Sequence, residues 1–284
     1  MKFSGGKEER TIESNHSASR RVLPACARGR QRNPLRAGAA RSYQVSFRLN
    51  GYALAPASCL GYTFTLGTAT FVPGVTDTGN HCDDCFTGIA LPFSVQLYDQ
   101  MFTTANVGSN GALFFGTADP TFAITCSPFG VAGTTYTMGP YWTDQVTNCT
   151  GCGIFTTTTG TAPNRVFYIE YLTNYFIAPL TLDYEVALYE NGKPPFQFIY
   201  NTVNALTVAS DSQLVVGVKK DDTTFTQYGC DTTGGESPPV SSGQALTATC
   251  VQASPTPPPT PTPTATPRAT PRPRPTPHPR PTPP

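Results

Sequence analysis

The sequence has few charged residues, few histidines and methionines, and no long apolar run. Charged side chains make up 13% of the 284 residues, about half of the roughly 25% that is usual in globular proteins. Only three methionines and no runs rich in Glu, Lys, Leu and Ala are present, which argues against an all-α protein. No stretch is long and apolar enough to predict a membrane-spanning helix.

The sequence patterns of common catalytic sites are missing as well. His16 and His278 lie near the chain ends, so only His81 is left for a catalytic triad, and no G-x-S-x-G pattern accompanies it. There is no H-E-x-x-H, P-loop or dinucleotide-binding pattern. We therefore expect a protein that is not an enzyme. The alternative is a secreted hydrolase of the glycosidase type, using a carboxylate pair such as Glu170 and Glu185.

A secretion signal is not visible in residues 1–43, because this region lacks an apolar core of roughly 7–15 residues. It carries ten Lys and Arg against three Asp and Glu and shows no strand or helix periodicity. We expect a disordered basic head. Either the true start of the chain differs, or this head is not native sequence.

Although the net charge of the chain is +1, its central part, the acidic body, carries more Asp and Glu than Lys and Arg. Residues 44–253 contain five Lys and Arg but fifteen Asp and Glu, whereas residues 254–284 contain four Arg and no acid. Because contacts to phosphates require clustered Lys and Arg, the acidic body argues against nucleic acid as a partner.

Short alternating runs, broken by Gly, Pro, Asn and Asp, fill residues 44–253. They predict strands over residues 62–66, 89–97, 112–115, 166–171, 182–189, 196–200, 214–218, 225–228 and 245–250. Because no helical pattern lies between these runs, we expect an all-β domain, a single antiparallel β-sandwich of jelly-roll-like type braced by disulfides.

Residues 182–189 carry the clearest strand pattern. Leu182, Tyr184, Val186 and Leu188 are expected to face the core, with Asp183 and Glu185 facing water. The following Glu190-Asn191-Gly192-Lys193 predicts a hairpin turn. In residues 89–97, Pro92 indicates an edge strand or a bulge, because proline cannot donate to a sheet. Asp221-Asp222 is expected at a hairpin tip.

Eight of the nine cysteines lie in the acidic body, namely Cys59, Cys82, Cys85, Cys126, Cys149, Cys152, Cys230 and Cys250. An even number predicts four disulfides and an oxidising compartment. We expect a Cys230–Cys250 bond. The two C-x-x-C pairs either close on themselves or bond to Cys59 and Cys126. A zinc-binding intracellular protein that uses both pairs is the disfavoured alternative, since more than sixty residues separate them.

Two further groups of residues are candidates for binding. Asp77, Asp83 and Asp84 form an oxygen-rich cluster that is a weak candidate for calcium. Because short Asp side chains are ordinary in turns, we expect no cofactor. Trp142, Asp144, Tyr168 and Tyr189 form a possible ligand surface, with Tyr175 as a further aromatic that could stack on sugars. Most aromatic residues are nevertheless expected in the core.

Residues 254–284 have proline at every second or third position. This spacing blocks helix and sheet pairing and favours extended polyproline II. We expect a Pro/Thr/Arg-rich stalk or linker.

Two motifs resemble the nidogen-like extracellular domains. Residues 109–116, SNGALFFG, and residues 139–144, GPYWTD, follow the pattern of that family, and residues 165–171 and 184–189 fall at its aromatic-rich strands. Residues 77–85 and the Pro/Thr-rich tail are similar to secreted bacterial proteins of this general type. The resemblance covers residues 77–250, and the C-x-x-C loops depart from it.

The resemblance implies a secreted or cell-surface module for binding, adhesion or structure, with no catalytic residues to carry over. An extracellular glycan or protein is the expected partner. Asp144 is the position that carries over best, and we interpret it as an acid that caps a turn beside a buried Trp142.

Overall fold

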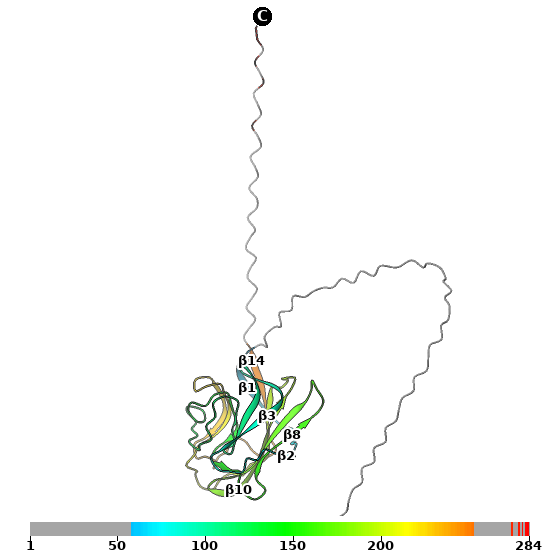
Figure 1. Cartoon of the computed structure of the whole chain (residues 1–284). Coiled ribbons are helices and arrows are strands. Elements are labelled where there is room, and N and C mark those ends of the chain that lie inside the picture. Colours follow the sequence, from blue (N-terminus) through cyan, green and yellow to red (C-terminus); the bar gives the residue numbers. More distant parts are fainter. Residues whose placement is uncertain (1–57, 253–273, 275–277, 279, 281, 284) are drawn as a thin grey trace, which may run out of the picture. The chain divides into compact units, whose positions relative to one another are not determined.

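The computed structural model describes residues 58–252 and the isolated residues 274, 278, 280, 282 and 283 (Figure 1). The predicted disordered head at 1–43 and nearly all of the predicted polyproline tail at 254–284 lie outside the described residues. Within the described part every regular element is a strand. No helix there has the length and apolarity needed to cross a membrane.

The larger of two antiparallel sheets contains β1 (Cys59–Gly67), β2 (Thr76–Asp77), β7 (Gln145–Val146), β8 (Gly153–Thr159), β9 (Val166–Tyr175), β10 (Ala178–Tyr189), β11 (Phe196–Thr202) and β14 (Ala245–Gln252). Their order is β1–β14–β11–β10–β9–β8–β2, with β7 paired to β9 beside this path. Runs of aromatic and β-branched residues, as in β9, favour such extended strands.

The smaller sheet contains β3 (Phe86–Leu97), β4 (Gln100–Gly108), β5 (Leu113–Phe114), β6 (Thr137–Trp142), β12 (Leu214–Lys219) and β13 (Phe225–Asp231). Their order is β13–β12–β6–β5–β4–β3. Pro92 lies in β3, which is an edge strand and shifts register between Ala90 and Val95. The position expected for this proline is therefore confirmed.

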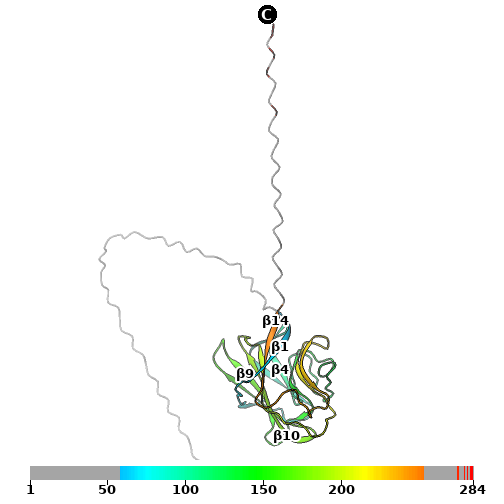
Figure 2. The same cartoon turned by 180° about the vertical axis from the view of Figure 1, so that it is seen from behind.

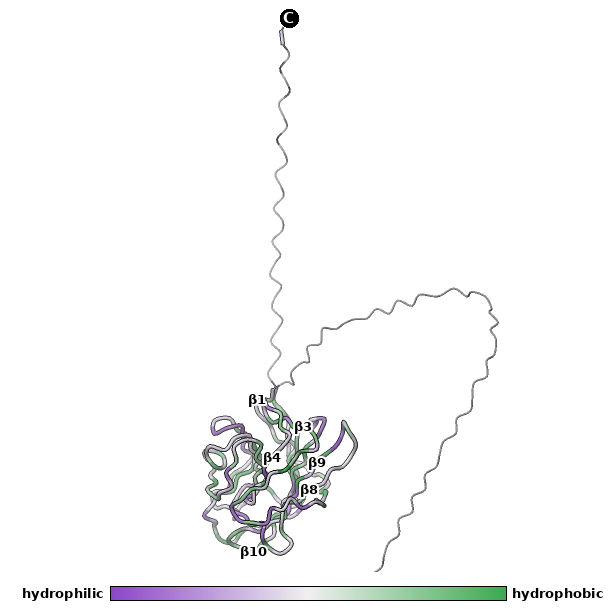
Figure 3. The backbone as a smooth tube through the Cα atoms, viewed as in Figure 1, coloured by the Kyte–Doolittle hydropathy of each residue, from purple (hydrophilic) through white to green (hydrophobic). Residues whose placement is uncertain are grey.

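The two sheets enclose one main core. Tyr171, Tyr184 and Leu188 of the larger sheet share it with Met138 and Val216 of the smaller one. The four side chains predicted to face the core from residues 182–189 are all fully buried. The all-β sandwich is thus confirmed, and both hydrophobic and hydrophilic stretches occur in the domain (Figure 3).

A segment between β1 and β2, residues 68–75, covers the outer face of the larger sheet. Its Ala69 and Phe71 pack against Ala187 and Ile199. We name it the covering segment. The expectation that Asp183 and Glu185 face water is wrong, because the covering segment buries this face and leaves them 9% and 0% exposed.

The outer face of the smaller sheet is covered in a similar way. Ile124, Phe129 and Val131, from the loop between β5 and β6, pack with Phe114 and Trp142 in a second apolar cluster. Trp142 therefore points away from the main core and is still completely buried.

Four disulfides join Cys59–Cys250, Cys82–Cys85, Cys126–Cys230 and Cys149–Cys152. Each C-x-x-C pair closes on itself, one of the two alternatives predicted. The expected Cys230–Cys250 bond is wrong, because Cys230 lies on β13 of the smaller sheet and Cys250 on β14 of the larger one.

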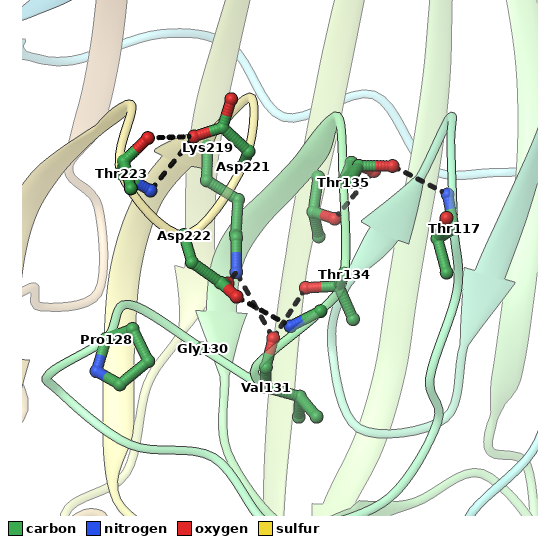
Figure 4. Close-up of polar contacts among 12 residues, drawn as sticks. Thr117, Pro128, Gly130, Val131, Thr134, Thr135, Lys219, Asp221, Asp222 and Thr223 are labelled. Atoms are coloured by element: carbon green, nitrogen blue, oxygen red, sulfur yellow. Dashed lines mark hydrogen bonds and ion pairs between the residues drawn. The ribbon is translucent and has the colours of Figure 1, made fainter.

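The hairpin between β12 and β13 carries a buried lysine (Figure 4). Lys219 Nζ donates to Asp222 Oδ1 at 2.6 Å and to the Val131 carbonyl at 3.2 Å. Asp222 Oδ2 accepts a hydrogen bond from the Gly133 amide at 2.9 Å. Asp221 and Asp222 lie at the hairpin tip as predicted, and Asp222 also anchors the loop between β5 and β6.

The domain has two distinct ends (Figures 1 and 2). Cys59 pairs with Gln252 at the terminal end, from which the chain continues into the proline-rich region. Because β14, β11, β10 and β9 are successively antiparallel, the β9–β10 hairpin at Phe176-Ile177 lies at the opposite end. We call this the distal end.

Candidate functional site

An acidic pocket of about 280 Å³ lies at the distal end. It is lined by Asp83, Asp84, Phe122, Asp144, Phe176 and Asp211. One carboxylate oxygen from each of Asp83, Asp84 and Asp144 lies within 4.8 Å of the others. Four carboxyl groups and two aromatic rings thus converge, and no basic side chain lines the pocket.

Asp83 and Asp84 are held inside a four-residue disulfide loop that Cys82 and Cys85 close. The backbone of Asp83 forms a β-bridge with Val146. Asp84 has a positive φ of 46°, and its Oδ1 accepts a hydrogen bond from Asn110 Nδ2 at 2.7 Å. The disulfide and these contacts fix the direction of both acids.

Asp144 lies between β6 and β7, and the amide of Phe176 donates to its carbonyl oxygen at 3.2 Å. Its side chain is buried, with 4% of the residue exposed. Burial, with the charges of Asp211, Asp83 and Asp84, raises the pKa of Asp144 to about 7. Within residues 58–252 its carboxylate has no hydrogen-bond partner, so the expectation that it caps a turn is wrong, although Trp142 is buried as predicted.

Asp211 reaches the pocket from the loop between β11 and β12. The amide of Ser210 donates to the Thr233 carbonyl at 2.8 Å. The loop that contains Thr233 is in turn closed by Asp231, whose carboxylate accepts the amides of Gly235 and Ser237 at 2.9 Å each. Two loops that follow different strands therefore hold this exposed acid in place.

The rim of the pocket is apolar. Phe122 is 42% exposed and Phe176 is 55% exposed. Ile177, beside Phe176 in the same hairpin, is also exposed. Neither phenylalanine was singled out from the sequence, because an exposed ring and a core ring look alike in an alternating pattern.

Asp77, the third member of the predicted calcium cluster, lies outside the pocket. Its Oδ2 is 2.8 Å from His81 Nε2, and this pair is exposed. The Gly79 amide and His81 lower the pKa of Asp77. The cluster predicted from Asp77, Asp83 and Asp84 is therefore regrouped: Asp144 and Asp211 take the place of Asp77.

The predicted aromatic surface is not formed. Trp142 and Tyr175 are fully buried, and Tyr175 Oη lies 2.5 Å from Tyr141 Oη. Tyr168 and Tyr189 are half-buried and pack against the apolar cluster under the covering segment. These rings contribute to packing. The ligand surface predicted at Trp142, Asp144, Tyr168 and Tyr189 is wrong for Trp142, whereas Asp144 lies in the acidic pocket.

The structure does not support the hydrolase hypothesis or the zinc hypothesis. Glu170 and Glu185 are 6% and 0% exposed, and each accepts a backbone amide of the covering segment, so no substrate reaches them in this arrangement. The zinc hypothesis needs four thiolates, whereas the cysteines of both C-x-x-C pairs are bonded to each other.

The sequence carries two usable signals for the pocket. Asp144 belongs to the GPYWTD motif that resembles the nidogen-like pattern, and Asp83-Asp84 belongs to a C-x-x-C loop. Asp211 had no signal, because an acid in a loop rich in Ser is ordinary.

Comparison with known proteins gives one family. A family model described as NIDO related matches residues 61–257. No curated protein and no solved structure matches the chain.

Proposed function

The chain belongs to the NIDO-related family, and on that basis we propose that it is a non-catalytic extracellular module that binds a glycan at its distal end. The family and the four disulfides indicate an extracellular location. The observation that carries the binding proposal is the acidic pocket between Phe122 and Phe176.

The chemistry of this pocket fits a sugar. Carboxylates accept hydrogen bonds from hydroxyl groups, and charged acceptors make the stronger bonds. An exposed aromatic ring offers an apolar face to the C–H face of a sugar. The pocket volume of about 280 Å³ is close to the lower limit of small-molecule sites, roughly 300 Å³. Such a pocket suits a single sugar unit better than an extended polypeptide segment.

The position of the pocket supports the same function. The chain enters and leaves the domain at the terminal end, where Cys59 pairs with Gln252. The pocket lies at the distal end, close to the β9–β10 hairpin. A domain connected at one end is free to present the other end to a ligand.

A glycan array probed with the full, disulfide-bonded chain tests this proposal. We expect retention on a subset of glycans, lost in the double variant Phe122→Ser/Phe176→Ser. The matched control is Leu60→Ser, since Leu60 is an apolar residue on β1 with 60% exposure at the terminal end. Absence of retention on every glycan, or equal loss in the control, would contradict the proposal. Retention on immobilised matrix proteins alone would identify a protein ligand instead.

A further inference from the structure

The carboxylates of the distal pocket are arranged as ligands for a cation. We propose that Asp83, Asp84 and Asp144 together bind one Ca²⁺ ion, with its remaining coordination positions open to water or to ligand hydroxyl groups. The role of the ion in ligand contact rests on the function proposed above, whereas the ion site itself does not.

The spacing of the three acids fits a shared ion. Calcium takes six to eight oxygen ligands at about 2.3–2.6 Å. Two oxygens on opposite sides of one ion are therefore separated by about 5.2 Å at most. The chosen oxygens of Asp83, Asp84 and Asp144 all lie within 4.8 Å of one another, inside that limit. The three carboxylates are therefore close enough to share one ion.

A second observation points to a ligand at the same place. The Asp144 carboxylate faces the pocket from a residue that is only 4% exposed, and within residues 58–252 it has no hydrogen-bond partner. A carboxylate that has lost most of its hydration and makes no protein hydrogen bond is costly to leave unpaired. Asp83, Asp84 and Asp211 add like charges around it. A bound cation would satisfy this carboxylate and neutralise the repulsion.

The donor set selects the type of metal. Every candidate donor in the pocket is an oxygen, which suits calcium or magnesium and disfavours zinc. Magnesium demands nearly ideal octahedral geometry, whereas calcium tolerates irregular sites. Acids from a disulfide loop and from the turn between β6 and β7 form an irregular site, so we assign calcium.

Titration calorimetry with CaCl₂ on the full, disulfide-bonded chain, after treatment with a chelator, tests the site. We expect one ion per chain with a dissociation constant of about 10⁻⁴–10⁻³ M, the range of extracellular modules. Asp144→Asn removes one charge at nearly constant volume and should weaken binding by about 10-fold or more. Asp83→Asn should weaken calcium binding to the same extent, and because Asp83 is exposed, this change should not affect folding.

Asp77→Asn is the matched control, since Asp77 is a nearby acid outside the pocket. Its affinity for Ca²⁺ should equal that of the wild type. Trp142 fluorescence and the thermal midpoint in chelator verify the fold of each variant. Absence of binding heat, or equal weakening in Asp77→Asn, would overturn the site.

The glycan array, repeated with calcium and with chelator, separates the two proposals. Calcium binding without retention on any glycan supports the ion site and contradicts the glycan function alone. Retention that persists in chelator, in a chain that binds no calcium, contradicts the ion site alone.

Discussion

Glu170 and Glu185 lie directly opposite each other on β9 and β10, and the covering segment bonds to both. The Gly74 amide donates to Glu170 Oε2 at 2.6 Å, and the Val72 amide donates to Glu185 Oε1 at 3.1 Å. Glu185 Oε2 is buried without a hydrogen-bond partner among the described residues. Because these two neighbouring acids are buried under the covering segment, the stability of this region depends on pH.

The first prediction concerns that sensitivity. Burial raises the pKa of Glu185 from 4.5 to about 8 and that of Glu170 to about 7. A carboxyl with a higher pKa in the folded chain binds more protons there than in the unfolded chain. The free energy of unfolding therefore falls as pH rises from about 4.5 to about 8. Urea unfolding between pH 5 and pH 8.5 measures this fall.

Glu185→Gln isolates the contribution of one acid. The groups that face Glu185 are Glu170, Asp183, Tyr168 and Tyr189. The variant keeps the shape and removes the charge, so it should match the wild type near pH 5 and exceed it by about 1–3 kcal/mol at pH 8.5. Glu190→Gln, which instead loses an ion pair with Arg165, serves as the control. If the free energies of unfolding of Glu185→Gln and the wild type differed by the same amount at all pH values, the prediction would be contradicted.

The burial of Glu185 could not be predicted from the sequence. Alternation along residues 182–189 predicted the strand and its core face, because successive side chains of a strand point to opposite faces of the sheet. It could not predict that residues 68–75 cover the opposite face. The same holds for the disulfides: Cys230 and Cys250 are consecutive cysteines in the sequence, but strand order puts them in different sheets.

The acidic pocket was predicted in part for a similar reason. Asp83 and Asp84 were identified because they are adjacent in a short polar loop. Asp144 and Asp211 reach them only through the pairing of strands far apart in the sequence. Asp77, close in sequence, is directed to His81 instead. Sequence proximity therefore identified two of the three proposed ligands, whereas Asp77 lies outside the pocket.

A second prediction concerns the close approach of Gly130 to Trp142. Gly130 has a positive φ of 77°, and a β-carbon there would overlap the Trp142 ring. Gly130→Ala should lower the free energy of unfolding by about 2–4 kcal/mol, from backbone strain and overpacking together. The fluorescence of Trp142, the single tryptophan, reports the unfolding.

Gly133→Ala is the matched control for this variant. Gly133 has a similar φ of 80°, but nothing lies within 4 Å of its added β-carbon. It should therefore show the backbone strain alone, about 1 kcal/mol. Equal losses in the two variants would mean that the contact with Trp142 has no effect on stability.

A third prediction concerns the ion pair in Figure 4. The Lys219 side chain is fully buried, and that of Asp222 is 39% exposed. Asp222→Asn leaves a buried ammonium group without its counter-charge, so we expect a loss of about 1–3 kcal/mol, reduced by the solvent at Asp222. Lys219→Met removes the charge and keeps the length, and should be less destabilising. Urea unfolding at neutral pH measures both, and the reverse order would contradict this account.

The last prediction separates two disulfides by what each one does. Cys59–Cys250 joins residues 191 positions apart, whereas Cys82–Cys85 joins residues only three positions apart. Chain entropy gives the long loop a stabilisation of about 5 kcal/mol and the short one about 2 kcal/mol at most. The short loop carries Asp83 and Asp84, so its disulfide fixes proposed ligands more than it stabilises the fold. Cys59→Ala/Cys250→Ala should therefore lower stability most and leave calcium affinity unchanged. Cys82→Ala/Cys85→Ala should lower stability less, but calorimetry should show a calcium affinity about 10-fold weaker. Both double variants weakening calcium binding equally would mean that the disulfide loop does not preorganise the site.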